Sequence, residues 1–332
     1  YPYCMKQMIG IEVYACTGLT MDSNKVTMEH RISGQVLAIG INITMKSAGI
    51  RVLNSTIDYK FTAAANFWGT VTTGREPAKD IVVSLRSEAT LDNVTLKGMG
   101  AQAGGGNNGL MPPPVNCFVV CFGSTVEMGN STVMMAEYGV LVSDFSKLVL
   151  ERTNISVCSK YCMAVDTGAT AVLRSVTITS MVRGLQVSRG TATVYNSTLY
   201  NPTEFFMDSA SLVNLYNTSF QRSGIVIRDA SSSLNVSWYL DVNIHWQDGS
   251  PAVGVGSKVF DAVGGVVAER SSDESGSLGA TMTTREFNAR STEVVRFTPH
   301  RIVMQKGRLS DFALVILNAS QTADVMLVDS LG

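Results

Sequence analysis

Charged residues are scarce in this sequence, and they almost cancel. Asp, Glu, Lys and Arg make up 16% of the 332 residues, with 26 basic against 27 acidic side chains. A chain this balanced has no electrostatic attraction for nucleic acid or for an anionic membrane, so neither is expected as a partner. No run of 18 or more apolar residues occurs, so no membrane-spanning helix is expected.

The short motifs of common enzyme classes are missing as well. The glycine-rich run that starts at Ala103 lacks the Gly-Lys-Ser/Thr ending of a phosphate-binding loop, and no Gly-x-Ser-x-Gly elbow or EF-hand spacing occurs. The three histidines, His30, His245 and His300, lie far apart in the sequence. We therefore predict a protein without catalytic activity and without a metal ion or cofactor.

The cysteines form three local pairs in the sequence. They are Cys4, Cys16, Cys117, Cys121, Cys158 and Cys162, and the last two pairs have C-x3-C spacing. Zinc sites favour other spacings with a histidine nearby, so disulfides in an oxidising compartment are the preferred interpretation. Buried free thiols are the alternative, and the pairing is left open. Together with a first residue, Tyr1, that is not Met, this predicts a secreted, extracellular or cell-surface protein.

The most informative feature that is present is a repeat. Six segments begin with an apolar residue, run through polar or turn residues and reach a small residue. They start 20 to 23 residues apart, at Val120, Val142, Val165, Val187, Met207 and Ile227. A second set of segments follows the first five at a nearly constant distance. This period fits coils of three short strands stacked about 4.8 Å apart, and it does not fit helical repeats.

The sequence therefore predicts an all-β protein whose main domain is a right-handed parallel β-helix. The pattern extends upstream with longer coils, so the predicted β-helix covers residues 1–237 and includes an N-terminal cap. The excess length falls into loop insertions near residues 59–79 and 97–116. Turns tolerate such insertions, and functional surface often lies on them.

Nine asparagines begin an N-x-S/T sequon: Asn42, Asn54, Asn93, Asn130, Asn154, Asn196, Asn217, Asn235 and Asn318. They are candidates for N-glycosylation of a secreted protein. Most of them also recur in one column of the repeat, at a turn, where asparagine is favoured for its backbone conformation. A buried ladder of stacked asparagine side chains is therefore an alternative. Ser175 shares this column although it cannot carry an N-glycan, and Asn318 lies outside the repeat.

After residue 237 the columns stop, and several short alternating segments predict a β-sandwich over residues 238–332. The segments include Leu240-Asp-Val, Asp248-Gly-Ser-Pro-Ala-Val-Gly, Val259-Phe-Asp, Val266-Val-Ala, Ser275-Gly, Thr298-Pro-His and Lys306-Gly. Their order resembles the transthyretin-like or carboxypeptidase-regulatory-like sandwich. Such modules follow parallel β-helices in archaeal and some bacterial cell-surface proteins. The resemblance implies a surface-layer, sheath, filament or adhesin protein.

We thus expect a structural subunit whose principal partners are copies of itself, with surface glycans as a second class of partner. One alternative is a carbohydrate-binding or carbohydrate-cleaving β-helix, which stacked aromatic rings and carboxylates along one flank would favour. Asp144, Asp166 and Asp208 share a stretch of the repeat, but each is beside a turn, so we interpret them as solvated turn residues. The other alternative is an adhesin that uses the two loops.

Overall fold

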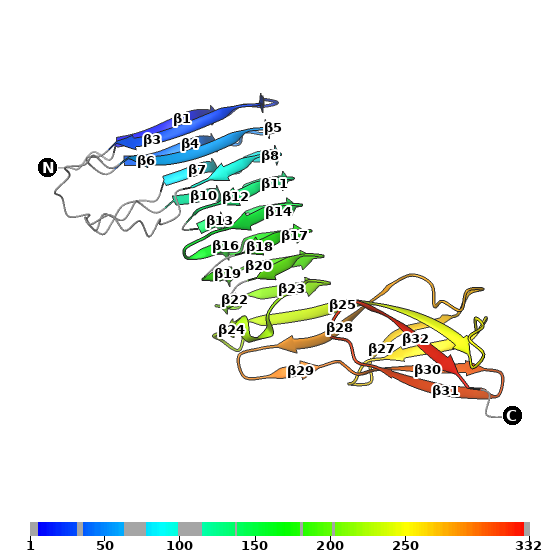
Figure 1. The fold of residues 1–332 in the computed structure, drawn as a ribbon. Coiled ribbons are helices and arrows are strands. Elements are labelled where there is room, and N and C mark those ends of the chain that lie inside the picture. The colour runs from blue at the N-terminus through cyan, green and yellow to red at the C-terminus, as the bar shows by residue number, and fades with distance from the viewer. Residues whose placement is uncertain are drawn as a thin grey trace. The chain divides into compact units, whose positions relative to one another are not determined.

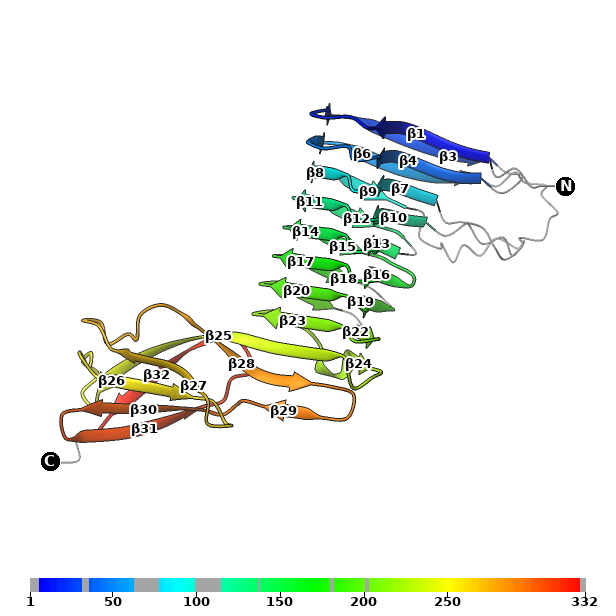
Figure 2. The same cartoon turned by 180° about the vertical axis from the view of Figure 1, so that it is seen from behind.

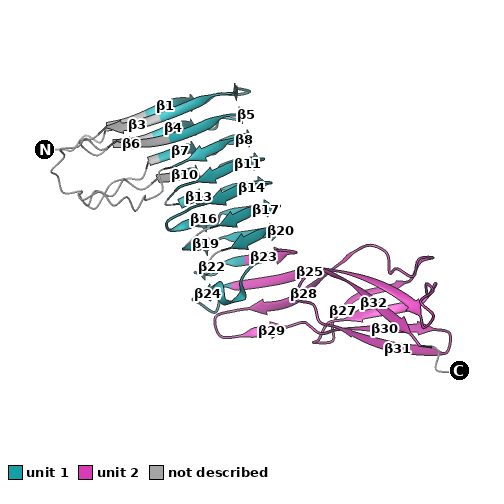
Figure 3. Ribbon diagram, in the orientation of Figure 1, with its two compact units in different colours: residues 1–212, 220–232 teal, residues 213–219, 233–332 magenta. Residues whose placement is uncertain are grey.

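The structure is a computed structural model, and it describes residues 6–31, 36–62, 78–98, 115–136, 138–179, 182–200 and 203–328. It divides into two compact units. Unit 1 comprises residues 1–212 and 220–232, and unit 2 comprises residues 213–219 and 233–332 (Figure 3). The predicted insertions near 59–79 and 97–116 lie mostly outside the described residues.

Unit 1 is a parallel β-helix, which confirms the predicted fold class. Its strands are stacked in three parallel sheets, and strands that follow each other in the sequence belong to different sheets (Figures 1 and 2). The first sheet contains β1 (Lys6–Tyr14), β4 (Val36–Thr44), β7 (Ala78–Val83), β10 (Val115–Val120), β13 (Tyr138–Val142), β16 (Tyr161–Asp166), β19 (Arg183–Ser188), β22 (Thr203–Asp208) and β24 (Ile225–Ile227).

The second sheet of unit 1 contains β2 (Thr20–Asp22), β5 (Ile50–Leu53), β8 (Glu88–Asp92), β11 (Thr125–Gly129), β14 (Lys147–Glu151), β17 (Thr170–Arg174) and β20 (Thr191–Tyr195). The third contains β3 (Lys25–Arg31), β6 (Thr56–Thr62), β9 (Thr95–Lys97), β12 (Thr132–Met134), β15 (Asn154–Ser156), β18 (Thr177–Thr179) and β21 (Thr198–Tyr200). A short 3-10 helix, η1 (Arg222–Gly224), precedes β24.

The core of unit 1 consists of apolar columns, because one position of the repeat recurs in every coil. In the second sheet, Leu91, Met128, Leu150 and Leu173 are registered neighbours and are almost fully buried. A single coil has no second layer against which to bury this row of side chains. Stacking of coils therefore supplies the hydrophobic burial that stabilises the fold.

The turn between the second and third sheets explains the asparagine column. Its left-handed residue has a positive φ in successive coils, and asparagine tolerates that conformation better than most residues. The residues at this position are Ser23, Asn54, Asn93, Asn130, Arg152, Ser175, Asn196 and Asn217. Ser175 is therefore in the predicted column. Asn154 is not, because Arg152 occupies the turn and Asn154 begins β15.

Unit 2 contains two sheets. One includes β23 (Leu212–Tyr216), β25 (Ser233–Trp246), β28 (Met282–Ala289), β29 (Val294–Arg296) and β32 (Gln321–Leu327), with β25 antiparallel to β28 and parallel to β32. The other is antiparallel and contains β27 (Val266–Ser271), β26 (Gly256–Phe260), β30 (His300–Lys306) and β31 (Leu309–Val315). The strand β28 was not predicted from the sequence.

Candidate functional site

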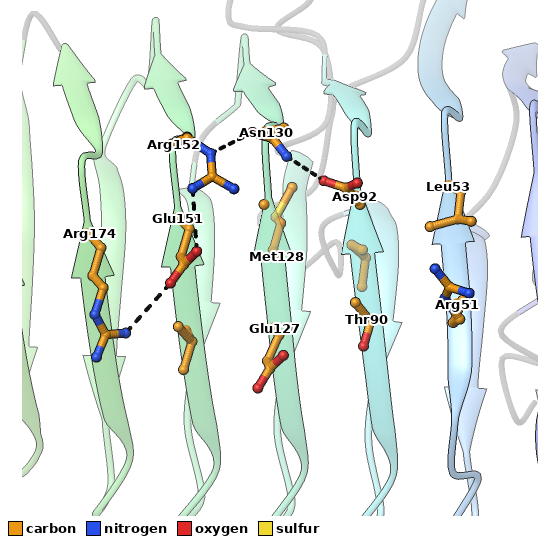
Figure 4. Close-up of a pocket in the computed structure, with 13 residues that line it drawn as sticks. Arg51, Leu53, Thr90, Asp92, Glu127, Met128, Asn130, Glu151, Arg152 and Arg174 are labelled. Atoms are coloured by element: carbon orange, nitrogen blue, oxygen red, sulfur yellow. Dashed lines mark hydrogen bonds and ion pairs between the residues drawn. The ribbon is translucent and has the colours of Figure 1, made fainter.

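A polar groove lies on the outer face of the second sheet of unit 1. It has a volume of about 450 Å³, and β5, β8, β11, β14 and β17 supply its walls (Figure 4). The groove is hollowed out at Gly129, because this residue has no side chain. Asp92, Gly129 and Glu151 are registered neighbours on adjacent strands, so two carboxylates flank a position that has no side chain. Across two strand spacings the α-carbons of Asp92 and Glu151 are about 9.6 Å apart.

The rim of the groove is a chain of polar contacts that links successive coils. The Asn130 amide donates to Asp92 Oδ1 at 2.7 Å, and Arg152 Nε donates to Asn130 Oδ1 at 2.7 Å (Figure 4). Arg152 also pairs with Glu151 at 3.6 Å, and Arg174 pairs with the same carboxylate at 3.9 Å. Because these ion pairs are exposed, each contributes little to stability. Their effect is to fix the positions of the polar groups along the rim.

Three carboxylates line this groove, and two of them are engaged by neighbouring side chains. Asp92 accepts a hydrogen bond from Asn130, and Glu151 is shared between two arginines. Glu127 lines the same groove. The groove can donate and accept hydrogen bonds with the hydroxyl groups of a polar ligand.

Sequence reasoning did not single out this groove. Asp92, Gly129, Glu151 and Arg174 occupy one phase of the repeat, so the register of the repeat was the available signal. Of the acidic residues that were considered, Asp144 accepts a hydrogen bond from the Ser143 hydroxyl at 2.9 Å and Asp166 pairs with Arg189 at 3.4 Å. Asp208 is half-buried, and its Oδ1 has no hydrogen-bond partner.

One cluster of aromatic rings in unit 1 lies on the first sheet. Tyr138 and Tyr161 are stacked with their ring centroids 5.7 Å apart. The Arg183 guanidinium covers Tyr161 and Phe206 at 5.1 and 5.0 Å, and Arg228 covers Phe206 at 4.6 Å. Cations therefore occupy these ring faces. On the second sheet, Tyr195 is the registered neighbour of Arg174 at the edge of the groove, and the Arg174 guanidinium lies 5.6 Å from the centroid of its ring.

A second surface feature is an apolar ridge on the turns between the first and second sheets. We call Met45, Leu85, Phe122 and Phe145 the turn ridge. Their exposed fractions are 42%, 43%, 56% and 74%. The turns stack directly on one another, because backbone hydrogen bonds run from Lys46 to Leu85 and from Arg86 to Phe122, and on along the column. All four ridge residues have positive φ, which turns their side chains away from the core.

The sequons differ in accessibility. The five in the turn column are Asn54, Asn93, Asn130, Asn196 and Asn217, of which the first four are exposed and Asn217 is half-buried. A hydrogen-bonded ladder exists, with Asn93 donating to Asn54 at 2.8 Å and Asn54 donating to Asp22 at 2.9 Å. It lies on the surface, so the expectation of a buried ladder was wrong. Adjacent turns are about 4.8 Å apart, so glycans on neighbouring turns would compete for space.

The remaining sequons lie outside this turn column. Asn42 is half-buried on β4, and its amide donates to Glu12 at 3.4 Å. Asn154 is exposed at the start of β15. In unit 2, the half-buried Asn235 donates to Asn214 at 2.9 Å and accepts from Asn288 at 2.8 Å, whereas Asn318 is exposed between β31 and β32.

The structure also separates Cys117 from Cys121, although the two are close in sequence. Cys117 lies inside the β-helix and contacts the Met134 carbonyl, whereas Cys121 packs in a separate cluster with Val82 and Val119. Four extended residues span about 13 Å, which is too far for a disulfide. The C-x3-C spacing therefore does not indicate a Cys117–Cys121 pair. Cys16 is half-buried, and Cys4 lies outside the described residues.

Within the described ranges, no group of three or more His, Cys, Asp or Glu side chains is arranged to hold a metal ion. None of the helical segments in those ranges has the length and apolar character that a membrane crossing requires. His245 and His300 both belong to unit 2, and the buried His300 contacts Thr284 at 2.7 Å. The side chain of His30 lies outside the described residues.

Comparison with known proteins gives one structural likeness. No family model and no curated protein sequence matches the chain. Among solved structures, full-length tailspike protein 2 from Escherichia coli O157:H7 bacteriophage CAB120 is similar over 94% of this chain, with 8% sequence identity and a TM-score of 0.31. The chain spans 64% of the length of that tailspike, which is less than two thirds.

Proposed function

We propose that this chain is an extracellular structural subunit without catalytic activity, which associates with copies of itself in a cell-surface filament, sheath or layer. The observation that carries the proposal is the turn ridge. Single exposed apolar residues are normal, but Met45, Leu85 and Phe122 recur at the same position of three consecutive turns, and Phe145 follows in the next turn, one residue after that position. Covering such a stripe with a partner contributes roughly 25 cal/mol per Å² of apolar area removed from water.

A second copy is the partner that fits the ridge best, because the ridge is complementary to itself. The ridge runs from Met45 to Phe145, with the cationic Lys46 at one end and the anionic Asp144 at the other. A two-fold axis between the turns of Leu85 and Phe122 would place Lys46 of each copy beside Asp144 of the other. Such an antiparallel contact is closed by symmetry and brings opposite charges together at both ends.

Analytical ultracentrifugation of the whole chain tests this proposal. We expect concentration-dependent association of the wild-type chain. Because burial of one Phe contributes about 1.5–3 kcal/mol, Phe122→Ser with Phe145→Ser should weaken association roughly 100-fold or more. Val263→Ser is the matched control, since Val263 is 61% exposed on a turn of unit 2.

Electron microscopy of native material provides the second measurement. Filaments, tubes or lattices with a repeat of one subunit would support the proposal. A wild-type chain that stays monomeric at every concentration, with dispersed single particles in the native material, would contradict it.

Glycan binding in the polar groove is the second candidate, because the groove presents carboxylate and guanidinium groups side by side (Figure 4). Both groups bond the hydroxyls of sugars readily. Titration calorimetry with polysaccharides from the native surface should show binding that Gly129→Leu abolishes by filling the hollow. Lys147→Leu, on the same sheet outside the groove, should bind normally. Release of new reducing ends would contradict the non-catalytic proposal.

A further inference from the structure

The interior of the β-helix contains a short column of thiol groups. Cys117, Gly139 and Cys162 occupy equivalent positions on the neighbouring strands β10, β13 and β16, and all three are buried. The thiols of the two cysteines make the same contact in their coils. Each donates at 3.6 Å to the backbone carbonyl of the residue 17 positions later, Met134 for Cys117 and Thr179 for Cys162.

The middle coil has a glycine at this position, and a cysteine from elsewhere fills the space. The Cys158 thiol donates to the Ser156 carbonyl at 3.6 Å, and Ser156 is the registered partner of Met134 in the third sheet. A Cβ atom on Gly139 would lie 3.2 Å from Cys158 Sγ. Cys158 therefore takes the place that a side chain at position 139 would have occupied.

Local backbone geometry directs Cys158 into the interior. The preceding residue, Val157, has a φ of 55°, so the chain turns there before β16 begins. Cys158 and Cys162 lie at the two ends of this short connection, and they are 3% and 0% exposed. Their thiol groups interact with each other across the connection. The Cys162 thiol and burial raise the pKa of the Cys158 thiol, so Cys158 does not supply a reactive thiolate in the folded chain.

We propose that Cys158 and Cys162 form a disulfide bond in the oxidised protein, while Cys117 and Cys121 remain thiols. The oxidant is a disulfide of the secretory compartment or an equivalent small-molecule disulfide. One cysteine thiolate attacks it and forms a mixed disulfide with loss of one thiol. The second cysteine then displaces the other thiol, so two cysteine thiols lose two protons and two electrons and two oxidant thiols form. Because both sulfurs are buried after folding, this exchange takes place before the coil closes.

Cys158 and Cys162 are assigned as the pair because they interact and because the other buried cysteines are less well placed. Cys121 lies in a separate cluster, so it cannot reach the column. The Cys117 thiol belongs to the column, but the Cys158 thiol interacts more strongly with Cys162, which lies at the other end of the same short connection. The bond would also join the turn to β16 across the Gly139 site. The proposal does not depend on the proposed assembly function.

Peptide mapping tests the pairing directly, because Lys160 lies between the two cysteines. The full chain is refolded with oxidised glutathione, deglycosylated, alkylated with iodoacetamide under denaturing conditions without reductant, and digested with trypsin. Cleavage after Arg152, Lys160 and Arg174 gives peptides 153–160 and 161–174. We expect these peptides as one linked species, two hydrogen masses lighter than their sum, with Cys117 and Cys121 alkylated.

Two variants and one further measurement complete the test. Cys121→Ser should keep the linked species, whereas Cys158→Ser should lose it and leave Cys162 alkylated. Dithiothreitol should lower the thermal midpoint of the wild-type chain and leave that of Cys158→Ser unchanged. Alkylation of both Cys158 and Cys162 in the wild-type chain would overturn the proposal, as would a peptide that links Cys117 to either of them. The wild-type map decides even if a variant fails to fold.

Discussion

Asp80 provides the sharpest test of how this interior is organised. It lies on β7, is 0% exposed, and neither of its carboxyl oxygens has a hydrogen-bond partner. Burial is the main reason that its pKa is raised from 3.8 to about 8, and the charge of Asp58 contributes to the rise. The nearby Cys117 thiol acts in the opposite direction, but it donates its proton to the Met134 carbonyl. Replacing Asp80 with asparagine removes the ionisation and keeps the shape of the side chain.

The sign and size of the effect follow from linkage. Between pH 3.8 and about 8 the folded chain holds a proton that the unfolded chain has released. Stability therefore falls as the pH rises through this window, by at most about 1.4 kcal/mol per pH unit. Below the window both states are protonated and the contribution is complete. Above the window Asp80 is ionised in both states, and the loss of stability is complete. That loss is roughly 6 kcal/mol as an upper bound.

Thermal unfolding of the wild-type chain and of Asp80→Asn, measured between pH 5 and pH 7, is the assay. Over these two pH units the wild-type chain should lose roughly 3 kcal/mol relative to the variant. At about 2 °C per kcal/mol for a unit of this size, the difference between the two thermal midpoints should change by roughly 6 °C. The change of this difference with pH is diagnostic. The asparagine amide does not ionise, so any effect of its own on the midpoint is the same at every pH.

Asp144→Asn, a substitution at a half-buried turn residue, is measured over the same pH range as the control. Parallel pH profiles for the wild-type chain and Asp80→Asn would refute the reasoning. They would mean that Asp80 is ionised in the folded state and paired with a cation or water.

Three further predictions concern single positions. Gly139→Ala should cost about 1–3 kcal/mol in urea unfolding, because its Cβ would lie 2.5 Å from a backbone oxygen, while Gly256→Ala, with its nearest atom at 3.6 Å, should cost little. Asn130→Ala should cost about 1–2 kcal/mol, because alanine is strained at a φ of 49° and the two rim hydrogen bonds are lost; wild-type stability in denaturant would contradict this. Intact-glycopeptide mass spectrometry of native material should find a glycan on the exposed Asn318 and none on Asn235, whose amide is engaged; the reverse occupancy would contradict the accessibility argument.

The sequence by itself was sufficient for the architecture of unit 1. A period of 20 to 23 residues fits the length of one coil of three short strands, and the same apolar phase recurs in each coil. The turn column was also predictable, including Ser175, because the left-handed conformation selects a few residue types. The strand β28 escaped notice because its Thr-Thr-Arg-Glu segment has little apolar alternation.

Contacts between coils were decided only by the tertiary structure. Sequence proximity grouped Cys117 with Cys121, but register and strand direction put the two side chains in different clusters. The sequence predicted that most of the sequons share one turn column, and the structure places Arg152, not Asn154, at the left-handed position of its turn. The polar groove and the turn ridge each depend on residues from several coils. A sequence specifies which residues share a phase, whereas stacking at about 4.8 Å determines which of them meet and which face water.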